Sequence, residues 1–294
     1  MSELSRPNLR VGVVGAGRAG SVIGAALRAA GHEIVAVSAV SDASRERAAE
    51  LLPGVPIRPV ERVVSEADVV ILGVPDDAIE PLANGLAAEK LWGPGKLVIH
   101  LSGFHGVEAL AAVTTAHGDA IALHPVMTFS GTPADLDRLP GTPFAITASA
   151  GVGVVAEALV LDLGGLPVAI AEGDRAAYHA ALAHAANHLV TVIAQSEQVL
   201  REIGVEDPGR FIAPLVEAAT TNALERGDRA LTGPVSRGDV GTVRAHLDAL
   251  IKHSADIEPA YRALAQATLE RAALRRAMPA EAVLPLRELL AGDD

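Results

Sequence analysis

Side chains that could move a proton or orient a carbonyl group lie in three short stretches of this sequence. They are Ser102, His105, His124, His179 and Asn187. Histidine exchanges a proton near neutral pH, so it can act as a general acid or base. Serine and asparagine can hydrogen-bond to a substrate oxygen. These residue types suit the protonation of a carbonyl or imine group, provided that the fold brings them together.

The first three of these side chains follow two predicted strands. Ser102 and His105 come at the end of the apolar run KLVIHLS (96–102), and His124 lies at the end of DAIALHP (119–125). In a parallel sheet covered by helices, ligands bind in the crevice beyond the carboxyl ends of the strands. The sequence therefore predicts that all three side chains face one crevice.

The other two side chains lie on one long predicted helix (172–204). His179 and Asn187 are eight residues apart, which is about 12 Å along a helix. They could border a small substrate from two sides without touching each other. On the same helix His184 and His188 share a face, as metal ligands would, but the sequence has no H-E-x-x-H motif and no evident third ligand. We therefore predict no metal site.

The elements that must position these residues alternate regularly. Up to residue 171, short β-branched runs alternate with alanine-rich stretches long enough for helices. The runs lie at 9–15, 32–39, 67–74, 96–102, 119–125, 143–148 and 166–171. Such nearly all-apolar strands are typical of a parallel sheet covered on both faces. After residue 171 the runs stop. Helices are expected at 172–204, 207–227, 239–254, 256–276 and 279–291.

The segment VGVVGAGRAGSVIGAAL (11–27) places a glycine-rich turn between the first strand and a helix. Gly15 allows the tight turn, Gly17 lets the backbone approach a pyrophosphate, and Gly20 allows close packing of helix on strand. The amino-terminal end of the helix would face the phosphate charge. The alternative is a packing turn that holds no ligand. The residues of the predicted dinucleotide-binding loop are Gly15, Ala16, Gly17, Arg18, Ala19 and Gly20.

The end of the second strand indicates which dinucleotide would bind. Domains that bind NAD place an acidic residue there, about 20 residues past the glycines, to hold the ribose. This sequence has SAVS at residues 38–41, and the first carboxylate, Asp42, comes a few residues late. A 2′-phosphate could be held by Ser38, Ser41, Ser44 and Arg45, and Arg18 would add positive charge nearby. The sequence therefore favours NADP over NAD.

A further segment, GVPDDAIEPL (73–82), follows a predicted strand and opens a helix. Pro75 suits a first helical position, and Asp76 and Asp77 complement the helix dipole. The two aspartates are therefore expected to cap the helix rather than to catalyse. The backbone of Val74 and Pro75 would lie along the cofactor.

Together these features predict an α/β fold with two domains. Residues 1–171 would form an N-terminal Rossmann domain, with a doubly wound parallel sheet that binds NAD(P). Residues 172–294 would form an all-helical domain for substrate binding and dimerisation. In that domain the loop LTGPVSRGD precedes a helix and could contact substrate through Thr232, Ser236 and Arg237.

Composition excludes several classes of protein. The 294 residues carry a net charge of −12, which argues against nucleic acid as a partner. The absence of cysteine excludes disulfides and thiolate catalysis. The first ten residues contain no apolar stretch of the kind a signal peptide has, and the apolar region 151–171 is interrupted by Glu157, Asp162 and Pro167. We expect a cytoplasmic protein that does not enter the membrane.

The whole chain resembles a family of Rossmann-like oxidoreductases that carry a C-terminal domain of unknown function. The matching stretches are GAGRAG, HLSGFHGVEAL, ALHPVMTF, YHAALAHAANHLVTV and LTGPVSRGDVGTVRAHL. More broadly, the arrangement resembles the superfamily of ketopantoate reductase, pyrroline-5-carboxylate reductase, prephenate dehydrogenase and 6-phosphogluconate dehydrogenase. In those enzymes a helical domain follows the Rossmann domain, and its first long helix lines the active site.

The resemblance implies roles for individual residues. Ketopantoate reductases carry, on this helix, a lysine eight residues before an asparagine. The asparagine matches Asn187, and His179 stands where the lysine would be. His179 would then donate the proton, Asn187 and Ser102 would orient the carbonyl, and Arg237 would pair with a substrate carboxylate or a cofactor phosphate. Further contacts to substrate would come from His105, His124, Thr232 and Ser236.

The leading hypothesis is therefore an NADPH-dependent reductase of a small 2-oxo acid such as ketopantoate. An imine substrate, as in pyrroline-5-carboxylate reductase, is the first alternative. The missing lysine motivates a second alternative, a dinucleotide-binding protein without turnover. A third, a metal-dependent hydrolase, would need a bound metal. The alanine- and leucine-rich helices and the resemblance predict a homodimer through the helical domain.

Overall fold

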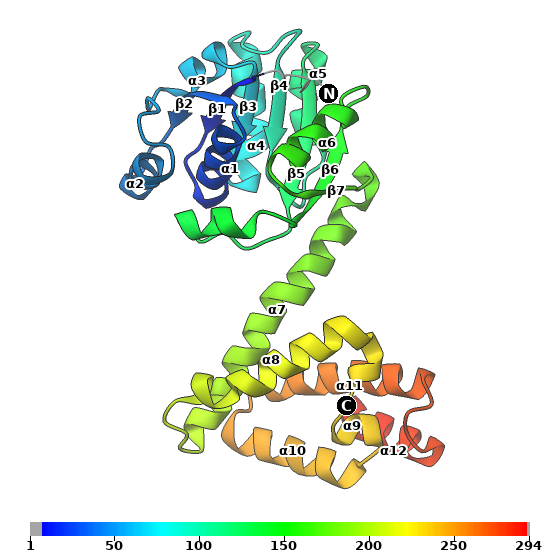
Figure 1. The fold of residues 1–294 in the computed structure, drawn as a ribbon. Coiled ribbons are helices and arrows are strands. Elements are labelled where there is room, and N and C mark those ends of the chain that lie inside the picture. Colours follow the sequence, from blue (N-terminus) through cyan, green and yellow to red (C-terminus); the bar gives the residue numbers. More distant parts are fainter. Residues whose placement is uncertain (1–7, 293–294) are drawn as a thin grey trace, which may run out of the picture. The chain divides into compact units, whose positions relative to one another are not determined.

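The computed structural model describes residues 8–292 (Figure 1). The chain divides into two compact units between Leu182 and Ala183. This division lies inside a helix, whereas the sequence pattern placed the domain boundary at residue 171, where strands give way to helices. Each unit is described below by itself.

The first unit is built on a sheet of seven strands within the described residues. The strands are β1 (Arg10–Val14), β2 (Glu33–Ser38), β3 (Val69–Leu72), β4 (Leu97–His100), β5 (Asp119–Pro125), β6 (Pro143–Ala148) and β7 (Leu166–Ala169). Their order is β2-β1-β3-β4-β5-β6-β7. Each of the seven expected β-branched runs forms one of these strands.

The sheet is mostly parallel, and one pair departs from the expected arrangement. All pairs from β2 to β5 are parallel, but β6 runs antiparallel to β5, with His124 opposite Ala145. A parallel neighbour needs a crossover connection, usually a helix. The chain between β5 and β6 has only a short 3-10 helix, η2 (Pro133–Arg138), so it returns to the sheet as an antiparallel strand.

Helices cover both faces of this sheet. They are α1 (Arg18–Ala29), α2 (Asp42–Leu51), α3 (Val60–Glu66), α4 (Asp76–Ala88), α5 (Ala111–Thr115) and α6 (Gly153–Asp162). Val13 of β1 packs in one apolar cluster with residues of α1, α2 and α6, while its neighbour Val14 packs in another with residues of α3, α4 and α5. Successive side chains of a strand point to opposite faces, so each of the strands β1 to β5 contributes to both clusters. The runs had to be apolar throughout for this reason.

The second unit is entirely helical within the described residues. Its helices are α7 (Arg175–Glu202), which begins in the first unit, α8 (Pro208–Arg226), α9 (Pro234–Arg237), α10 (Val240–His253), α11 (Glu258–Leu274) and α12 (Ala280–Ala291). The buried core comes from α9 to α12 and includes Val243, Leu269 and Leu286. In contrast, α7 and α8 contribute no buried residue to that core. In the part of the chain that the structure describes, we find no helix with the length and hydropathy of a membrane span.

Candidate functional site

The turn between β1 and α1 is closed by three glycines in mutual contact. Gly15 has a φ of +94°, and a Cβ there would lie 2.7 Å from the carbonyl oxygen of Gly73. A Cβ on Gly20 would collide with the carbonyl oxygen of Gly15, and one on Gly73 would lie 2.8 Å from the same atom. Larger residues at these positions would force the turn apart. The third glycine contact, Gly73 after β3, was not singled out from the sequence.

Gly17 is less crowded than these glycines, although its Cβ position is not open. The only heavy atom near it is the carbonyl oxygen of Gly73, at 3.2 Å. Gly17 is also the N-cap of α1, where no side chain caps the helix and no acidic residue lies in the first turn. A helix N-terminus of this kind binds anions through its free N–H groups and its dipole. The turn therefore fits the phosphates of a dinucleotide.

Two of the serines expected to hold the 2′-phosphate accept hydrogen bonds from backbone N–H groups. The Ser38 hydroxyl is buried and accepts a hydrogen bond from the Gly15 N–H at 2.9 Å. Ser41 caps α2 by accepting from the Ser44 N–H at 3.2 Å. Arg45 lies exposed, with Nη1 3.5 Å from a carboxylate oxygen of Asp42.

Val74 packs beside the glycine turn, 3.2 Å from the Cβ position of Gly15, and Pro75 is the N-cap of α4.

Two arginines lie against this turn, and one of them was missed in the sequence. Arg47 donates from Nε to the Ala16 carbonyl at 3.1 Å. Its Cδ and the Cγ of Arg18 would lie 2.9 and 3.0 Å from a Cβ on Gly131. The Gly131 turn is fixed by the buried Asp135, which accepts from the Gly131 N–H at 2.8 Å. Nothing local to Arg47 in the sequence indicates this placement, because α2 reaches the glycine turn only in the folded sheet.

A second turn, at residues 102–106, follows β4 and rests on a buried histidine. His100 Nδ1 accepts from the Ser102 N–H at 3.2 Å, and its Nε2 donates to the Gly106 carbonyl at 2.9 Å. Burial lowers the pKa of His100 to about 4, so the ring is neutral at neutral pH. The Ser102 hydroxyl accepts from the N–H groups of Phe104 and His105, both at 3.1 Å.

The carboxylate of Glu172 completes the support of this turn. It accepts from the N–H of Val107 at 2.8 Å and from that of Glu108 at 3.2 Å, at the start of the 3-10 helix η1 (Val107–Leu110). A Cβ on Gly106 would collide with this carboxylate. A cavity of about 620 Å³ opens beside the turn and is bordered by Phe104 and His105.

Two further side chains expected in the site meet at Gly103. A Cβ on Gly103 would lie 3.0 Å from Nε2 of His124 and 2.9 Å from Cδ2 of His179. The Phe104 ring lies edge-on to both His105 and His179, with centroids 5.0 and 6.1 Å away. The first unit therefore brings together Ser102, His105, His124 and His179.

The remaining expected site residues lie in the second unit. Asn187 is exposed on α7. Its backbone carbonyl accepts a hydrogen bond from the Thr191 hydroxyl at 3.3 Å. Thr232 is exposed, and so is Arg237 at the end of α9, while the buried Ser236 donates its hydroxyl to the Gly233 carbonyl at 3.2 Å. Their roles in binding substrate stay predictions.

Two residues at the start of α7 were not predicted and contact the site directly. Tyr178 places its hydroxyl 2.7 Å from Nδ1 of His124. Arg175 is 2% exposed, and its guanidinium lies 5.9 Å from the centre of the Tyr178 ring. The sequence offered a signal for Tyr178, since it directly precedes His179. For Arg175 it offered none, because a charged residue at a helix start is ordinarily exposed.

Metal ligands are not gathered here. His184 and His188 lie on one face of α7, with their Nδ1 atoms 2.8 Å apart. The described residues contain no group of three or more histidine or acidic side chains arranged to hold a metal ion.

The comparisons with known proteins match two families along this chain. Residues 1–125 match the model of the Rossmann-like domain, and residues 142–268 match that of the domain of unknown function DUF2520. The second match begins at β6, so it includes the last two strands of the sheet. The chain thus joins a Rossmann-like domain to a DUF2520 domain. No protein with a curated description matches the sequence.

Solved structures share this fold at low sequence identity. Protein BF3122 from Bacteroides fragilis, provisionally named an NADP oxidoreductase, has a TM-score of 0.71 at 21% identity, covering 90% of this chain and 98% of its own. An imine reductase from Myxococcus stipitatus in complex with NADP+ has a TM-score of 0.61 at 20% identity, covering 90% and 92%. Pyrroline carboxylate reductase from Plasmodium falciparum with NADP bound has a TM-score of 0.57 at 12% identity, covering 96% and 98%.

Proposed function

We propose that this chain, in which a Rossmann-like domain precedes a DUF2520 domain, is an NADP(H)-dependent reductase of a small carbonyl or imine compound. The observation that carries the proposal is the glycine turn after β1. In this turn Gly17 is the N-cap at the uncapped amino-terminal end of α1, and a Cβ there would lie 3.2 Å from the carbonyl oxygen of Gly73. That geometry suits a bound phosphate, which the free N–H groups of the helix end can bind.

NADP(H) fits the residues around this turn. The pyrophosphate would lie at the N-terminus of α1, and Val74 and Pro75 would lie along the rest of the cofactor. Arg18 and Arg47, which lie against the same turn, would hold the 2′-phosphate that distinguishes NADP from NAD. When bound, the reduced cofactor supplies the hydride. The structures of the imine reductase and pyrroline carboxylate reductase hold NADP at the same fold, which supports this preference.

The crevice residues would act on the group that receives the hydride. His179 would donate the proton, and Ser102 would orient the reacting group together with Asn187. The Ser102 hydroxyl accepts two backbone hydrogen bonds, which leaves its own proton free to be donated to a substrate atom. His105 borders the cavity beside the site and would contact the substrate, and so would Thr232, Ser236 and Arg237 of the helical unit.

Two substrate classes remain candidates for this reductase. A 2-oxo acid such as ketopantoate suits an arginine that pairs with its carboxylate, the role proposed for Arg237. An imine is supported by the names of two of the solved structures that share the fold. Assays of NADPH oxidation with a panel of 2-oxo acids and cyclic imines would separate the two. A dinucleotide-binding protein without turnover would bind NADPH but would not oxidise it in the presence of any of these compounds.

Calorimetric titration with NADPH and NADH tests the cofactor site directly. We expect wild-type protein to bind NADPH more tightly than NADH, and Gly17→Val to lose both while remaining folded. Gly85→Ala is a matched control, because Gly85 lies in α4 with open space around its Cβ position. Absence of binding to wild-type protein would reduce the glycine turn to a packing feature and overturn the reductase function.

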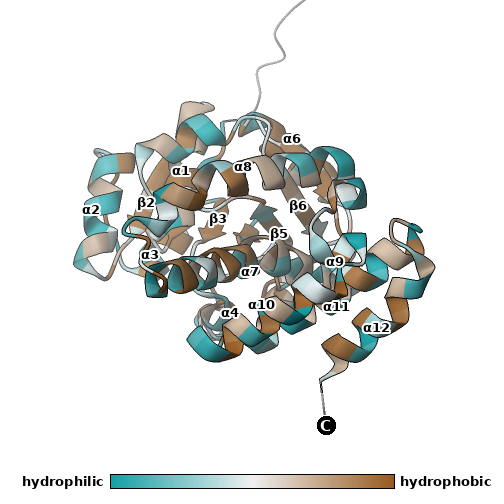
Figure 2. Ribbon diagram, turned by 90° about the horizontal axis from the view of Figure 1, so that it is seen from below, coloured by the Kyte–Doolittle hydropathy of each residue, from teal (hydrophilic) through white to brown (hydrophobic). Residues whose placement is uncertain are grey.

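We also propose that the helical unit assembles with a second copy of the chain. No residue of α7 beyond Leu182 is buried, and α8 buries only Pro208. Both helices nevertheless carry apolar turns, shown in brown in Figure 2. Helices of this length gain most of their stability from packing an apolar face, so these faces need a partner. The exposed apolar side chains are Leu189, Val190, Val192, Phe211, Leu215 and Leu224.

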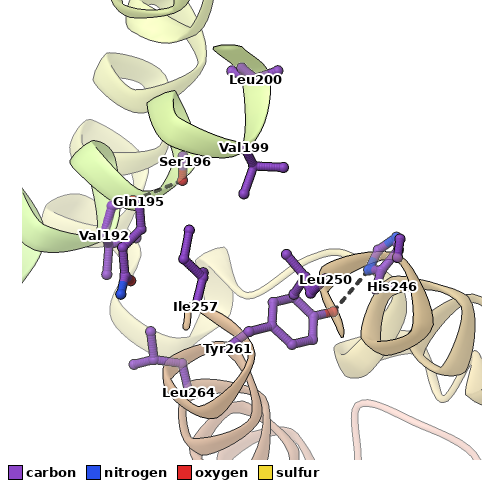
Figure 3. Close-up of a pocket in the computed structure, with 11 residues that line it drawn as sticks. Val192, Gln195, Ser196, Val199, Leu200, His246, Leu250, Ile257, Tyr261 and Leu264 are labelled. Atoms are coloured by element: carbon purple, nitrogen blue, oxygen red, sulfur yellow. Dashed lines mark hydrogen bonds between the residues drawn. The ribbon is translucent and has the colours of Figure 1, made fainter. Parts of the chain in front are cut away.

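A groove in the same unit offers a place for that partner (Figure 3). It has a volume of about 380 Å³ between α7, α10 and α11, and apolar side chains line most of it, with Tyr261 hydrogen-bonded to His246 at 2.8 Å. Phe211 and Leu215 of α8 are four residues apart and form a short apolar ridge. A helix that presents such a ridge can lie in an apolar groove. We therefore place α8 of the second copy in this groove.

A further inference from the structure

His124 and Tyr178 form a hydrogen-bonded pair beyond the carboxyl end of the sheet. His124 lies near the end of strand β5, and Tyr178 lies in the first turn of helix α7. Nδ1 of the histidine lies 2.7 Å from the phenolic oxygen, and the rings meet edge-on at 83°. The distance and the side-chain types allow only one proton between the two atoms.

The chemistry of the two groups decides which of them donates. A phenol is a stronger hydrogen-bond donor than a neutral imidazole, and an imidazole nitrogen is the stronger acceptor. Tyr178 therefore donates to Nδ1 of His124, and the remaining proton of the neutral ring is carried by Nε2. A hydrogen bond to one ring nitrogen fixes the tautomer in this way in many histidine sites.

The surroundings keep this ring neutral. Burial is the main cause that lowers the pKa of His124 to about 4, and the charges of Arg175, His179 and His100 act in the same direction. Asp76 acts in the opposite direction, with a smaller effect than burial, Arg175 or His179. The guanidinium of Arg175 is held in place by the Thr147 hydroxyl and by backbone carbonyls, without a carboxylate among its hydrogen-bond partners in the described residues.

Nε2 of His124 faces Gly103, where the turn after β4 has no side chain. A Cβ at that position would lie 3.0 Å from Nε2 and 2.9 Å from Cδ2 of His179. The glycine thus leaves room next to the edges of both rings. In this position the Nε2–H group of His124 can reach a substrate atom that lies near Gly103.

We propose that His124 is a fixed N–H donor to the carbonyl oxygen or imine nitrogen of the substrate, and that Tyr178 is the positioning residue that holds it in the donating tautomer. The inference rests on the proposed reductase function and goes beyond the substrate contact expected of His124, because it assigns the donating atom and adds Tyr178. As hydride adds to the substrate carbon, the π electrons move to the heteroatom. His124 stabilises that charge through its hydrogen bond and keeps its own proton, and the heteroatom takes a proton from His179.

The tautomer can be measured without cofactor or substrate. Two-bond ¹⁵N–¹H correlation spectra of the cofactor-free protein, between pH 5 and 9, report the protonation of each imidazole, and His124→Gln assigns the signals. We expect His124 to be neutral throughout, with its proton on Nε2. In Tyr178→Phe we expect a mixture of the two tautomers. A wild-type ring with its proton on Nδ1, or one that titrates near pH 6.5, would overturn the proposal.

Turnover distinguishes a donor from a proton carrier. A glutamine amide places an N–H group close to the position of Nε2 but has no second ring nitrogen. We expect His124→Gln to keep kcat within about tenfold of wild type, and His124→Leu to lower it by roughly 100-fold or more, as loss of an oxyanion donor does. His253→Leu, on the exposed end of α10, is the control and should keep wild-type turnover.

Equal inactivity of the glutamine and leucine variants, with both folded, would show that His124 carries a proton instead of donating a fixed hydrogen bond. NADPH calorimetry on wild-type protein and on the same variants distinguishes failure of the donor role of His124 from failure of the proposed reductase function. If wild-type protein binds no NADPH, the reductase function and the donor role both fall. If the variants bind NADPH normally and only turnover differs from expectation, the donor role alone falls.

Discussion

Arg175 donates from Nε to the hydroxyl of Thr147 at 2.7 Å, with the arginine side chain almost completely removed from solvent. Its Nη2 also donates to the carbonyls of Ala122 and Ala145, at 2.9 and 3.3 Å. These two residues lie on β5 and β6, the antiparallel pair of the sheet. One guanidinium at the start of α7 therefore joins the helix to the strands that carry the candidate site.

Replacement of this arginine should destabilise the first unit strongly. Arg175→Met would leave several buried acceptors without a donor, and each such group costs about 1–3 kcal/mol. We expect the free energy of unfolding to fall by about 3 kcal/mol or more, measured by urea denaturation with the fluorescence of Trp92. This tryptophan is the only one in the chain and is buried in the first unit. Arg62→Met, on an exposed face of α3, is the control, and an equal effect of both would contradict the assigned role.

The stability of the first unit should fall as the pH is lowered below about 6.5. Burial lowers the pKa of both His100 and His124 to about 4, from an ordinary value of 6.5. Between these two pH values the unfolded chain binds protons that the folded chain does not, so protonation favours unfolding. The histidines thus favour the folded state fully above pH 6.5, and this contribution is lost progressively down to about pH 4.

The measurement is the urea midpoint of Trp92 fluorescence between pH 4.5 and 8. His100→Gln removes one of the two buried titrating rings and should flatten the dependence relative to wild type. His253→Gln, exposed on α10, should leave the dependence unchanged. A wild-type midpoint that is constant from pH 7 to 5 would show that neither ring resists protonation.

Arg47 should discriminate between the two nicotinamide cofactors. Arg47→Ala removes a guanidinium that lies against the glycine turn, so we expect the Kd for NADPH to rise about tenfold or more, which corresponds to about 1.4 kcal/mol. The Kd for NADH should change little, since NADH has no 2′-phosphate. Arg62→Ala is the control for loss of one positive charge. An equal loss of NADH binding would mean that Arg47 acts only by supporting the Ala16 carbonyl.

The apolar face of α8 should control the oligomeric state. Leu215→Asp places a charge on a side chain that is 71% exposed in the single chain and buried in the proposed dimer. We expect light scattering to give twice the chain mass for wild type and the chain mass for the variant. Leu274→Asp puts the same charge on an exposed residue at the end of α11, outside this face, and should remain dimeric. A wild-type protein at the chain mass would overturn the second-copy proposal.

Much of the fold followed from local patterns in the sequence. The apolar runs predicted the strands, and the glycine-rich stretch 11–27 predicted the turn between the first strand and a helix. These features depend on residues close in sequence, because backbone conformation and the periodicity of apolar side chains are local properties. The sequence also placed Ser102 and His124 near the carboxyl ends of two successive strands, and in the structure Ser102 follows β4 while His124 lies at the end of β5.

The interactions that define the candidate site were decided by the tertiary structure. The hydrogen bond between His124 and Tyr178 joins residues 54 positions apart, and Arg47 reaches Ala16 across 31 positions. Strand order, the antiparallel return of β6 and the start of α7 together determine which of these side chains meet. No sequence spacing encodes that outcome, because it depends on how the elements pack against one another. The same packing buries Arg175 and His100, and burial lowers the pKa of His100 and His124 so that both rings are neutral at neutral pH.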